Sequence, residues 1–176
     1  MEKSIDFLKL AAARYSVRKF AKETVEQEKL EKVLEAGHLA PTAVNRQPQH
    51  ILVINEGSAL AKLTRCTKYH FNAPVALLVS YGKNECWKRV YDGKSSGEID
   101  ASIVTTHMML EAASIGLGTT WVMHFDPAAM RNEFDVPDNL EPVALLVMGY
   151  PAEDAKPSSA HSEFRPPEDI VSYNRF

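Results

Sequence analysis

Cysteine is scarce in this sequence, with Cys66 and Cys86 as the only two. They are too few for a disulfide framework and too far apart for the close cysteine pairs of a zinc site. The six histidines are scattered and form no His-Glu-x-x-His pattern, so we expect no catalytic metal. This cysteine usage is typical of a reducing compartment, and we expect a cytoplasmic protein.

Long apolar runs and an excess of positive charge are also absent. No stretch approaches the roughly 20 apolar residues of a membrane-spanning helix, and the first residues, MEKSIDFLKLAAARY, have no signal-peptide core. The net charge is −3, so the chain as a whole does not attract phosphate backbones. We therefore expect no membrane and no nucleic-acid partner, and any anion site must come from a local cluster.

Two nucleotide-binding motifs are present only in part. GLGTTW, residues 116–121, has Trp121 where a dinucleotide fingerprint has its third glycine, and it follows a helix-like segment rather than a strand. GKS, residues 93–95, has Lys88 where a phosphate loop begins with glycine. Neither a Rossmann site nor a P-loop is expected.

What the sequence does contain indicates one globular domain. It has 176 residues, of which 45% are hydrophobic and 24% charged, and we assign residues 1–176 to a single domain. Helical spacing predicts helices over 4–14, with Ser4 as cap, and over 25–40 and 58–64. It also predicts a helix from residue 98 that ends at Gly116 or Gly118, and one over 126–134 with Asp126 as cap before Pro127. Apolar runs of strand length predict buried strands over 50–54, 73–81, 119–125 and 141–150. The alternation is not that of a doubly wound sheet, so the fold class is α+β.

Three segments do not fit a simple monomer core. The helix over 98–116 is apolar almost all round, which favours burial in a core or an interface, and within it His107 is interpreted as a satisfied core residue. The proline-rich tail ends in apolar residues, Ile170 to Phe176, which suggests packing on a second subunit. The polar, glycine-containing segment 82–97 is typical of a mobile excursion or lid.

The stretch RYSVRKF gives the first candidate site. Arg14 and Arg18 flank Ser16, and guanidinium groups bind phosphate oxygens bidentately while a serine hydroxyl adds a donor. The alternative is structural: Arg14 at a helix end, Ser16 in a turn and Arg18 as a surface charge. Arg165, among the prolines of the tail, is a further candidate cation.

Two other stretches are weaker candidates. The loop APTAVNRQPQH, residues 40–50, collects Thr42, Asn45 and Gln47 between two prolines, either as a polar turn or as rigid amide groups that read a polyol or a heterocycle. The strand in GLGTTWVMHFDP follows two glycines, so its backbone N–H groups can face a planar ring, although a core strand is the simpler interpretation.

Taken in order, these motifs carry a family resemblance. R-x-S-x-R-x-F near residue 15, P-[ST]-x-x-N-x-Q-P near residue 45, the unit IDASIV…LEAASIGLGTTWV and the strand PVALLVMGYP follow one another. The combination resembles the nitroreductase family of FMN-dependent oxidoreductases over nearly the whole chain. The resemblance implies a mostly antiparallel central sheet flanked by helices, in an intertwined homodimer whose C-terminal arm, residues 150–176, reaches the partner.

The resemblance also implies two FMN molecules at the subunit interface, with site residues in three groups. The phosphate and ribityl end would be held by Arg14, Tyr15, Ser16, Arg18 and Arg165. The flavin would be approached by Pro41, Thr42, Asn45 and Gln47, with part of this loop coming from the other subunit. The pyrimidine side and N5 of the ring would be lined by Val122, Met123 and His124.

The activity that follows is ping-pong transfer of reducing equivalents from NADH or NADPH, through flavin N5, to a small acceptor such as a nitroaromatic or a quinone. Flavin N5 carries the chemistry, so no catalytic side chain is expected. The alternatives are a flavin-transforming or dehydrogenating relative and a non-enzymatic flavin-binding protein. The chain departs from the family pattern at Glu163, where a lysine often precedes Arg165, and at 82–97, which replaces a longer helical insertion.

Overall fold

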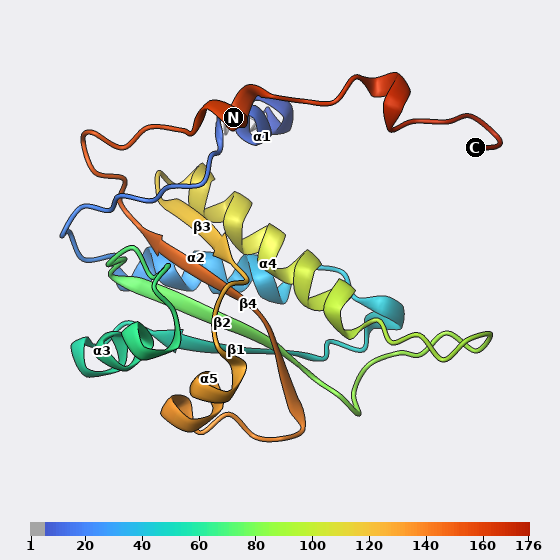
Figure 1. The fold of residues 1–176 in the computed structure, drawn as a ribbon, viewed down its shortest axis with the longest axis horizontal. Helices are drawn as coiled ribbons and strands as arrows, with labels where there is room; N and C mark the ends of the chain where they lie inside the picture. Colours follow the sequence, from blue (N-terminus) through green and yellow to red (C-terminus); the bar gives the residue numbers. More distant parts are fainter. Residues whose placement is uncertain (1–5) are drawn as a thin grey trace.

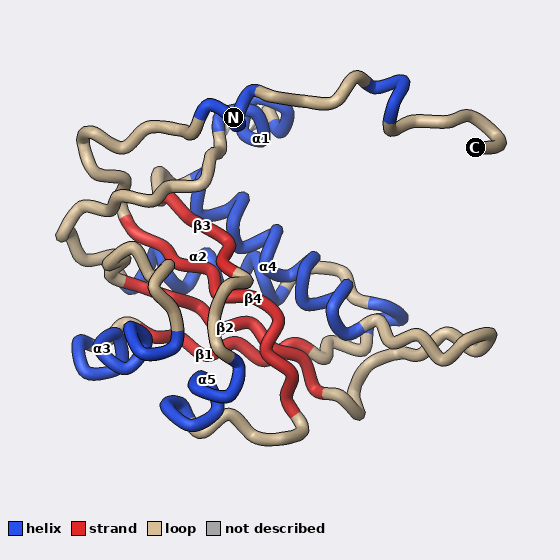
Figure 2. Tube along the Cα trace, in the orientation of Figure 1, coloured by secondary structure: helices blue, strands red, loops and turns tan. Residues whose placement is uncertain are grey.

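One four-stranded antiparallel sheet forms the centre of the molecule (Figures 1 and 2). The computed structural model describes residues 6–176. Its strand order is β1-β2-β4-β3, and each neighbouring pair is antiparallel. The strands are β1 (Gln49–Ile54), β2 (Val75–Gly82), β3 (Gly118–Val122) and β4 (Leu140–Gly149). The predicted α+β class with a mostly antiparallel sheet is confirmed.

Helices cover both faces of this sheet. They are α2 (Gln27–His38), α3 (Gly57–Cys66), α4 (Gly97–Ser114) and α5 (Pro127–Phe134). The first helix, α1 (Phe7–Ala13), belongs to neither core and has no buried residue. One hydrophobic core lies between the sheet and the pair α2 and α4, and the other between the sheet and the pair α3 and α5. All the expected helices and strands are present with ends shifted by a few residues. The cap of α1 is Asp6, while Ser4 lies outside the described residues.

The two central strands are packed on both faces, and this explains why their sequences are apolar without interruption. Leu77 and Val79 of β2 face the α2/α4 core, and Ala76 and Leu78 face the α3/α5 core. Both sides of such a strand are buried, so no polar alternation remains. The prediction of a buried strand over 50–54 was wrong in this respect, because β1 lies at the sheet edge and Leu52 is 38% exposed.

The end of α4 delivers the chain into β3 by a tight turn. Gly116 has φ of +83°, a left-handed conformation that favours glycine, and this confirms its predicted role as a helix stop. The Leu117 N–H donates to Ala112 O at 2.8 Å and the Gly116 N–H to Ala113 O at 3.3 Å. This pair of bonds is a Schellman motif, so β3 starts at a fixed position beside the helix end.

The segment that follows α1 runs along the outer edge of β3. The Val17 N–H donates to Thr119 O at 2.9 Å, the Thr120 hydroxyl donates to Val17 O, and Ser16 forms a parallel bridge with Thr119. Val17 is 2% exposed. The backbone of RYSVRKF is therefore fixed to the sheet by both hydrogen bonds and a buried side chain.

Replacing Gly118 with alanine should detach this segment. A Cβ at position 118 would lie 2.5 Å from Val17 Cγ2, closer than packed carbon atoms allow. We expect Gly118→Ala to lower the free energy of unfolding by about 1–3 kcal/mol, the usual cost of overpacking. Urea unfolding measures this. The matched control is Gly57→Ala, where a Cβ meets nothing within 4 Å; a Gly118 variant as stable as this control would contradict the contact.

The C-terminal segment leaves the body of the protein after β4. Figure 1 shows it passing α1 and continuing away from the sheet. Its apolar side chains are exposed, with Phe164 at 82%, Ile170 at 63% and Tyr173 at 84%. The contacts of this arm within the described chain leave these apolar side chains uncovered, which is typical of a surface that binds another molecule.

Across residues 6–176, the helices are too short or too polar for any of them to cross a lipid bilayer.

Candidate functional site

Arg14, Ser16 and Arg18 form a positively charged strip on the segment beside β3. Side chains two residues apart point to the same side of an extended backbone, so these three share one side. Arg14 is half-buried, and Arg18 is exposed and donates to Ser16 O at 3.2 Å. Neither arginine has a carboxylate partner within residues 6–176. Two fixed positive charges are thus left available for an anion.

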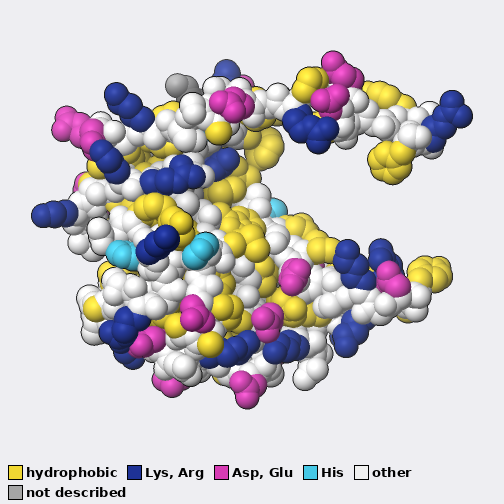
Figure 3. Space-filling model, in the orientation of Figure 1, with side chains coloured by type: hydrophobic (Ala, Val, Ile, Leu, Met, Phe, Trp, Pro, Cys, Tyr) yellow, Lys and Arg dark blue, Asp and Glu magenta, His cyan; other side chains and the backbone are white. Residues whose placement is uncertain are grey.

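Tyr15 and Lys19, which lie beside the residues of the strip, connect this segment to the C-terminal arm. The Tyr15 hydroxyl donates to Ala155 O at 3.4 Å, and its ring meets His161 edge-on at 6.1 Å between centroids. Lys19 pairs with Asp154, and this hydrogen bond lowers the pKa of the Asp154 carboxyl. Lys and Arg side chains gather over this part of the surface, at the upper left of Figure 3. The start of the C-terminal arm therefore supports the segment without neutralising Arg14 or Arg18.

The second predicted group surrounds a short 3-10 turn, Ala43–Asn45, that is fixed to α4. The Ala43 N–H donates to Asp100 Oδ1 at 2.8 Å, and the Ser96 hydroxyl donates to Asp100 Oδ2 at 2.7 Å. Asp100 is only 1% exposed. Asp100 was not among the predicted site residues, because it is one of three acids in α4 and only its burial distinguishes it. Because Asp100 uses both oxygens, it acts here as a support for the loop.

The loop that Asp100 supports has an unusual backbone. Val44, Asn45 and Gln47 have φ of 47°, 56° and 50°. A β-branched residue such as Val44 rarely adopts this region, and strain of this kind concentrates at functional sites. The Gln47 N–H donates to the Thr42 hydroxyl at 3.0 Å, which closes the turn. Thr42 is half-buried, and the side chains of Pro41, Asn45 and Gln47 are exposed.

The third predicted group continues from β3. Val122 is buried, Met123 is 70% exposed, and His124 O accepts from the Thr67 hydroxyl at 2.6 Å. The preceding residue, Trp121, has an indole N–H that is buried and has no hydrogen-bond partner in the described part of the chain. A buried unsatisfied donor is costly, so this N–H is suited to an acceptor supplied by a ligand or a second subunit.

One chain does not bring the three groups together. Ser16 pairs with Thr119 beyond the C-terminal end of α4, whereas Ala43 is bound to Asp100 near its N-terminal end. With 18 residues, α4 is about 27 Å long, so the two groups lie far apart in one chain.

Arg165, the last predicted site residue, donates to Asp169 O at 3.2 Å within the arm. Its place at the phosphate stays a prediction.

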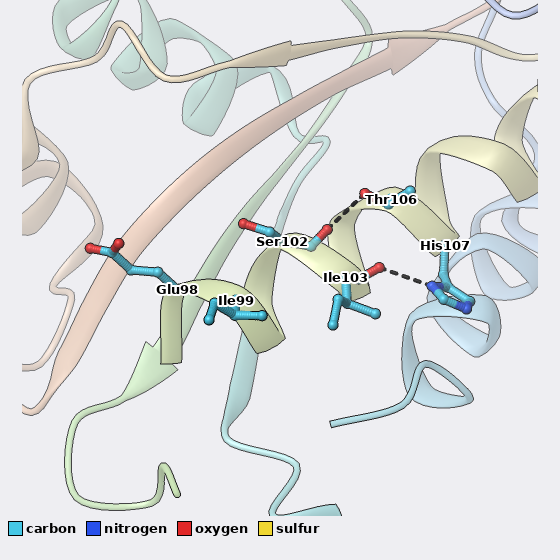
Figure 4. A pocket seen from close by; sticks show the side chains of 6 residues that line it. All are labelled: Glu98, Ile99, Ser102, Ile103, Thr106 and His107. Atoms are coloured by element: carbon cyan, nitrogen blue, oxygen red, sulfur yellow. Dashed lines mark hydrogen bonds between the residues drawn. The ribbon is translucent and has the colours of Figure 1, made fainter. Parts of the chain in front are cut away.

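The outer face of α4 is uncovered along this length. This open surface is formed by Glu98, Ile99, Ser102, Ile103, Thr106 and His107, all from one helix (Figure 4). The interpretation of His107 as a core residue was wrong, because its side chain is half-buried on this outer face. Its hydrogen bond is satisfied within the helix, since Nδ1 donates to Ile103 O at 2.9 Å. Ile99 is 52% exposed. The apolar residues of α4 thus pack into a core on one side of the helix and form an open surface on the other.

Comparison with protein families matches the Nitroreductase family to residues 11–69 and 67–150. This chain belongs to the nitroreductase family. Among solved structures, a nitroreductase family protein from Clostridium difficile 630 is 44% identical, covers 98% of this chain and 100% of its own, and superposes with a TM-score of 0.92. The predicted family, its fold and its oxidoreductase class are confirmed.

More distant relatives agree. A curated protein of Methanothermobacter thermautotrophicus with the provisional name NADH dehydrogenase/NAD(P)H nitroreductase is 29% identical over 85% of this chain and 80% of its own. A structure from Exiguobacterium sibiricum in complex with FMN shares the nitroreductase fold at 21% identity, with a TM-score of 0.83 over 98% of this chain and 99% of its own. The nitroreductase match includes all predicted site residues except Arg165.

Proposed function

We propose that this nitroreductase family protein is an FMN-dependent oxidoreductase. It takes reducing equivalents from NADH or NADPH and passes them in a ping-pong cycle to a small acceptor, such as a nitroaromatic or a quinone. The observation that carries the proposal is the strip of Arg14, Ser16 and Arg18, in which two arginines without carboxylate partners flank a hydroxyl on a fixed backbone. A curated relative from Bacillus subtilis, named FMN reductase [NAD(P)H], supports the same cofactor and donor.

The strip suits the phosphate of FMN in charge and in geometry. Guanidinium groups bind phosphate oxygens in pairs, and each charge-assisted bond contributes about 1.5–3 kcal/mol. Tyr15 would add backbone contacts, and Arg165 would join from the arm. Because the overall charge of the chain is negative, this local cluster determines where a phosphate binds.

The remaining groups suit a flavin ring. The orphaned Trp121 indole N–H lies in β3, one residue before Val122, Met123 and His124, and is a donor without an acceptor in the described chain. Pro41, Thr42, Asn45 and Gln47 would add contacts and amide donors and acceptors from the strained loop. Bound FMN supplies hydride chemistry at N5. These residues would hold and orient the ring and keep water from one of its faces, so no side chain need act as an acid or a base.

The complete site requires two copies of the chain. The loop 41–47 and the strip 14–18 lie toward opposite ends of α4, and a second copy seated on the open face of α4 would place one beside the other. The arm 150–176 offers exposed apolar side chains for the same contact. We propose a homodimer of single-domain subunits, residues 1–176, in the cytoplasm.

A spectrum of the purified protein tests this function. We expect a yellow protein whose visible absorbance bleaches when NADH or NADPH is added without oxygen, and returns when a nitroaromatic or a quinone follows. A colourless protein that refuses added FMN would contradict the cofactor. A yellow protein that neither donor bleaches would instead indicate a flavin-binding protein without this activity.

A further inference from the structure

The segment 83–96 is a hydrogen-bonded hairpin next to the loop that Asp100 supports. The Arg89 N–H donates to Lys94 O at 3.0 Å, and the Ser96 N–H donates to Trp87 O at 2.9 Å. At its base, Glu85 pairs with His50 at 2.9 Å. The sequence suggested a mobile lid here, but these bonds set a definite register. The side chains on the hairpin therefore have defined positions relative to α4.

The hairpin is positively charged in a chain of negative net charge. It contains four cations, Lys83, Lys88, Arg89 and Lys94, against two acids, Glu85 and Asp92. Lys83 pairs with Glu141, and Arg89 pairs with Asp92, whose pKa is lowered by that hydrogen bond. Among residues 6–176, Lys88 and Lys94 have no ion-pair partner.

A cavity of about 280 Å³ lies between this hairpin and α4. Trp87, Arg89 and Lys94 line it from the hairpin, and Ile99 and Ile103 line it from the helix. Asp100 also borders the cavity, but both of its oxygens already accept hydrogen bonds from Ala43 and Ser96. The cavity thus combines an aromatic ring, an aliphatic floor and a lysine ammonium without a carboxylate partner.

The cavity adjoins the proposed flavin site. Ala43, from the loop proposed to approach the flavin, forms part of its wall. Ile99 and Ile103 are shared with the open face of α4, where the second subunit is proposed to bind. A ligand in the cavity would therefore lie beside the place where two-electron donors must arrive.

We propose that this cavity binds the phosphorylated adenosine of NADPH and makes NADPH the preferred donor over NADH. Lys94 contacts the 2′-phosphate, and the adenine lies against Trp87; Arg89, already bound to Asp92, borders the cavity without a free charge. This proposal rests on the proposed function. The volume is just below the range of about 300–1,000 Å³ for small-molecule sites, which suits one nucleotide rather than a whole dinucleotide. Charge-assisted bonds to the 2′-phosphate are the contacts that NADH cannot make.

Titration calorimetry on the flavin-loaded protein tests the site without turnover. The probes are adenosine 2′,5′-bisphosphate and adenosine 5′-monophosphate, which differ only in the 2′-phosphate. We expect the bisphosphate to bind at least tenfold more tightly, and Lys94→Gln to remove most of that difference. The matched control is Lys83→Gln, a lysine of the same hairpin that pairs with Glu141 and does not line the cavity. Its preference should match that of the unaltered protein.

Three outcomes would overturn the proposal. They are equal affinity for the two probes, an equal loss in Lys83→Gln and Lys94→Gln, and a Lys94→Gln loss seen with nitrobenzoate but not with the bisphosphate. The last would assign the cavity to anionic acceptors. In steady-state kinetics, Lys94→Gln should lower the ratio of kcat/KM for NADPH to that for NADH about tenfold. A protein reduced equally well by both donors refutes only this inference, whereas one reduced by neither refutes the proposed function.

Discussion

Replacing Arg14 and Arg18 together with alanine should leave a folded protein that purifies without flavin. Each arginine is expected to make at least one charge-assisted bond to the FMN phosphate, and such a bond contributes about 1.5–3 kcal/mol. A loss of 1.4 kcal/mol raises a dissociation constant tenfold. We therefore expect Arg14→Ala and Arg18→Ala each to weaken FMN binding by about 10- to 150-fold. If the two losses add, the double variant should weaken it by at least 100-fold.

Quenching of FMN fluorescence on titration with apoprotein measures these affinities. The matched control is Lys22→Ala, which removes an exposed cation of the same segment outside the strip. It should change FMN affinity by less than about threefold at 0.15 M salt, since an exposed charge that makes no hydrogen bond to the phosphate is largely screened. Equal losses in Lys22→Ala and Arg18→Ala would indicate a general charge effect and would contradict a phosphate site at Arg18.

Asp100→Ala should destabilise the protein and release the loop 41–47. The substitution removes both acceptors from a buried position and leaves the Ala43 N–H without a partner. We expect the free energy of unfolding to fall by about 2–4 kcal/mol, the range for loss of buried hydrogen bonds to a charged group. Urea unfolding followed by circular dichroism measures the change.

The conservative variant Asp100→Asn separates shape from charge. Its amide oxygen can still accept from the Ala43 N–H, and its amide NH₂ can donate to the Ser96 hydroxyl, which then reverses its role. We expect it to recover more than half of the stability lost in Asp100→Ala. Proteolysis near Asn45 should be rapid in the alanine variant and slow in the asparagine variant. An Asp100→Ala protein as stable as the unaltered one would show that Asp100 does not support the loop.

Much of the fold could be predicted because local signals and tertiary packing agree. Asp126 accepts from the Ala128 and Ala129 N–H groups at the start of α5, as its position before Pro127 indicated. The uninterrupted apolar runs of β2 and β4 reflect burial on both faces. The apolar run of β1 predicts the same burial on both faces, yet this strand lies at a sheet edge. The prediction failed because the local sequence does not determine how many neighbours a strand has in the sheet.

The site could be predicted only in outline. Residue types and order indicated Arg14, Ser16 and Arg18, but not that β3 fixes their backbone through Val17 and Thr119. The loop that contains the positive φ of Val44 is bound to α4 through the Ala43 N–H and Asp100, which are 57 residues apart, so no local pattern reports this contact. The cavity beside the hairpin likewise depends on how 83–96 folds against α4.

The direct test of the account is the affinity of the apoprotein for FMN compared with riboflavin, which has the same ring and ribityl chain but no phosphate. If Arg14, Ser16 and Arg18 hold the phosphate, FMN should bind at least 100-fold more tightly than riboflavin, and the double arginine variant should bind the two about equally. Equal affinities in the unaltered protein would contradict the assignment of this strip to the cofactor.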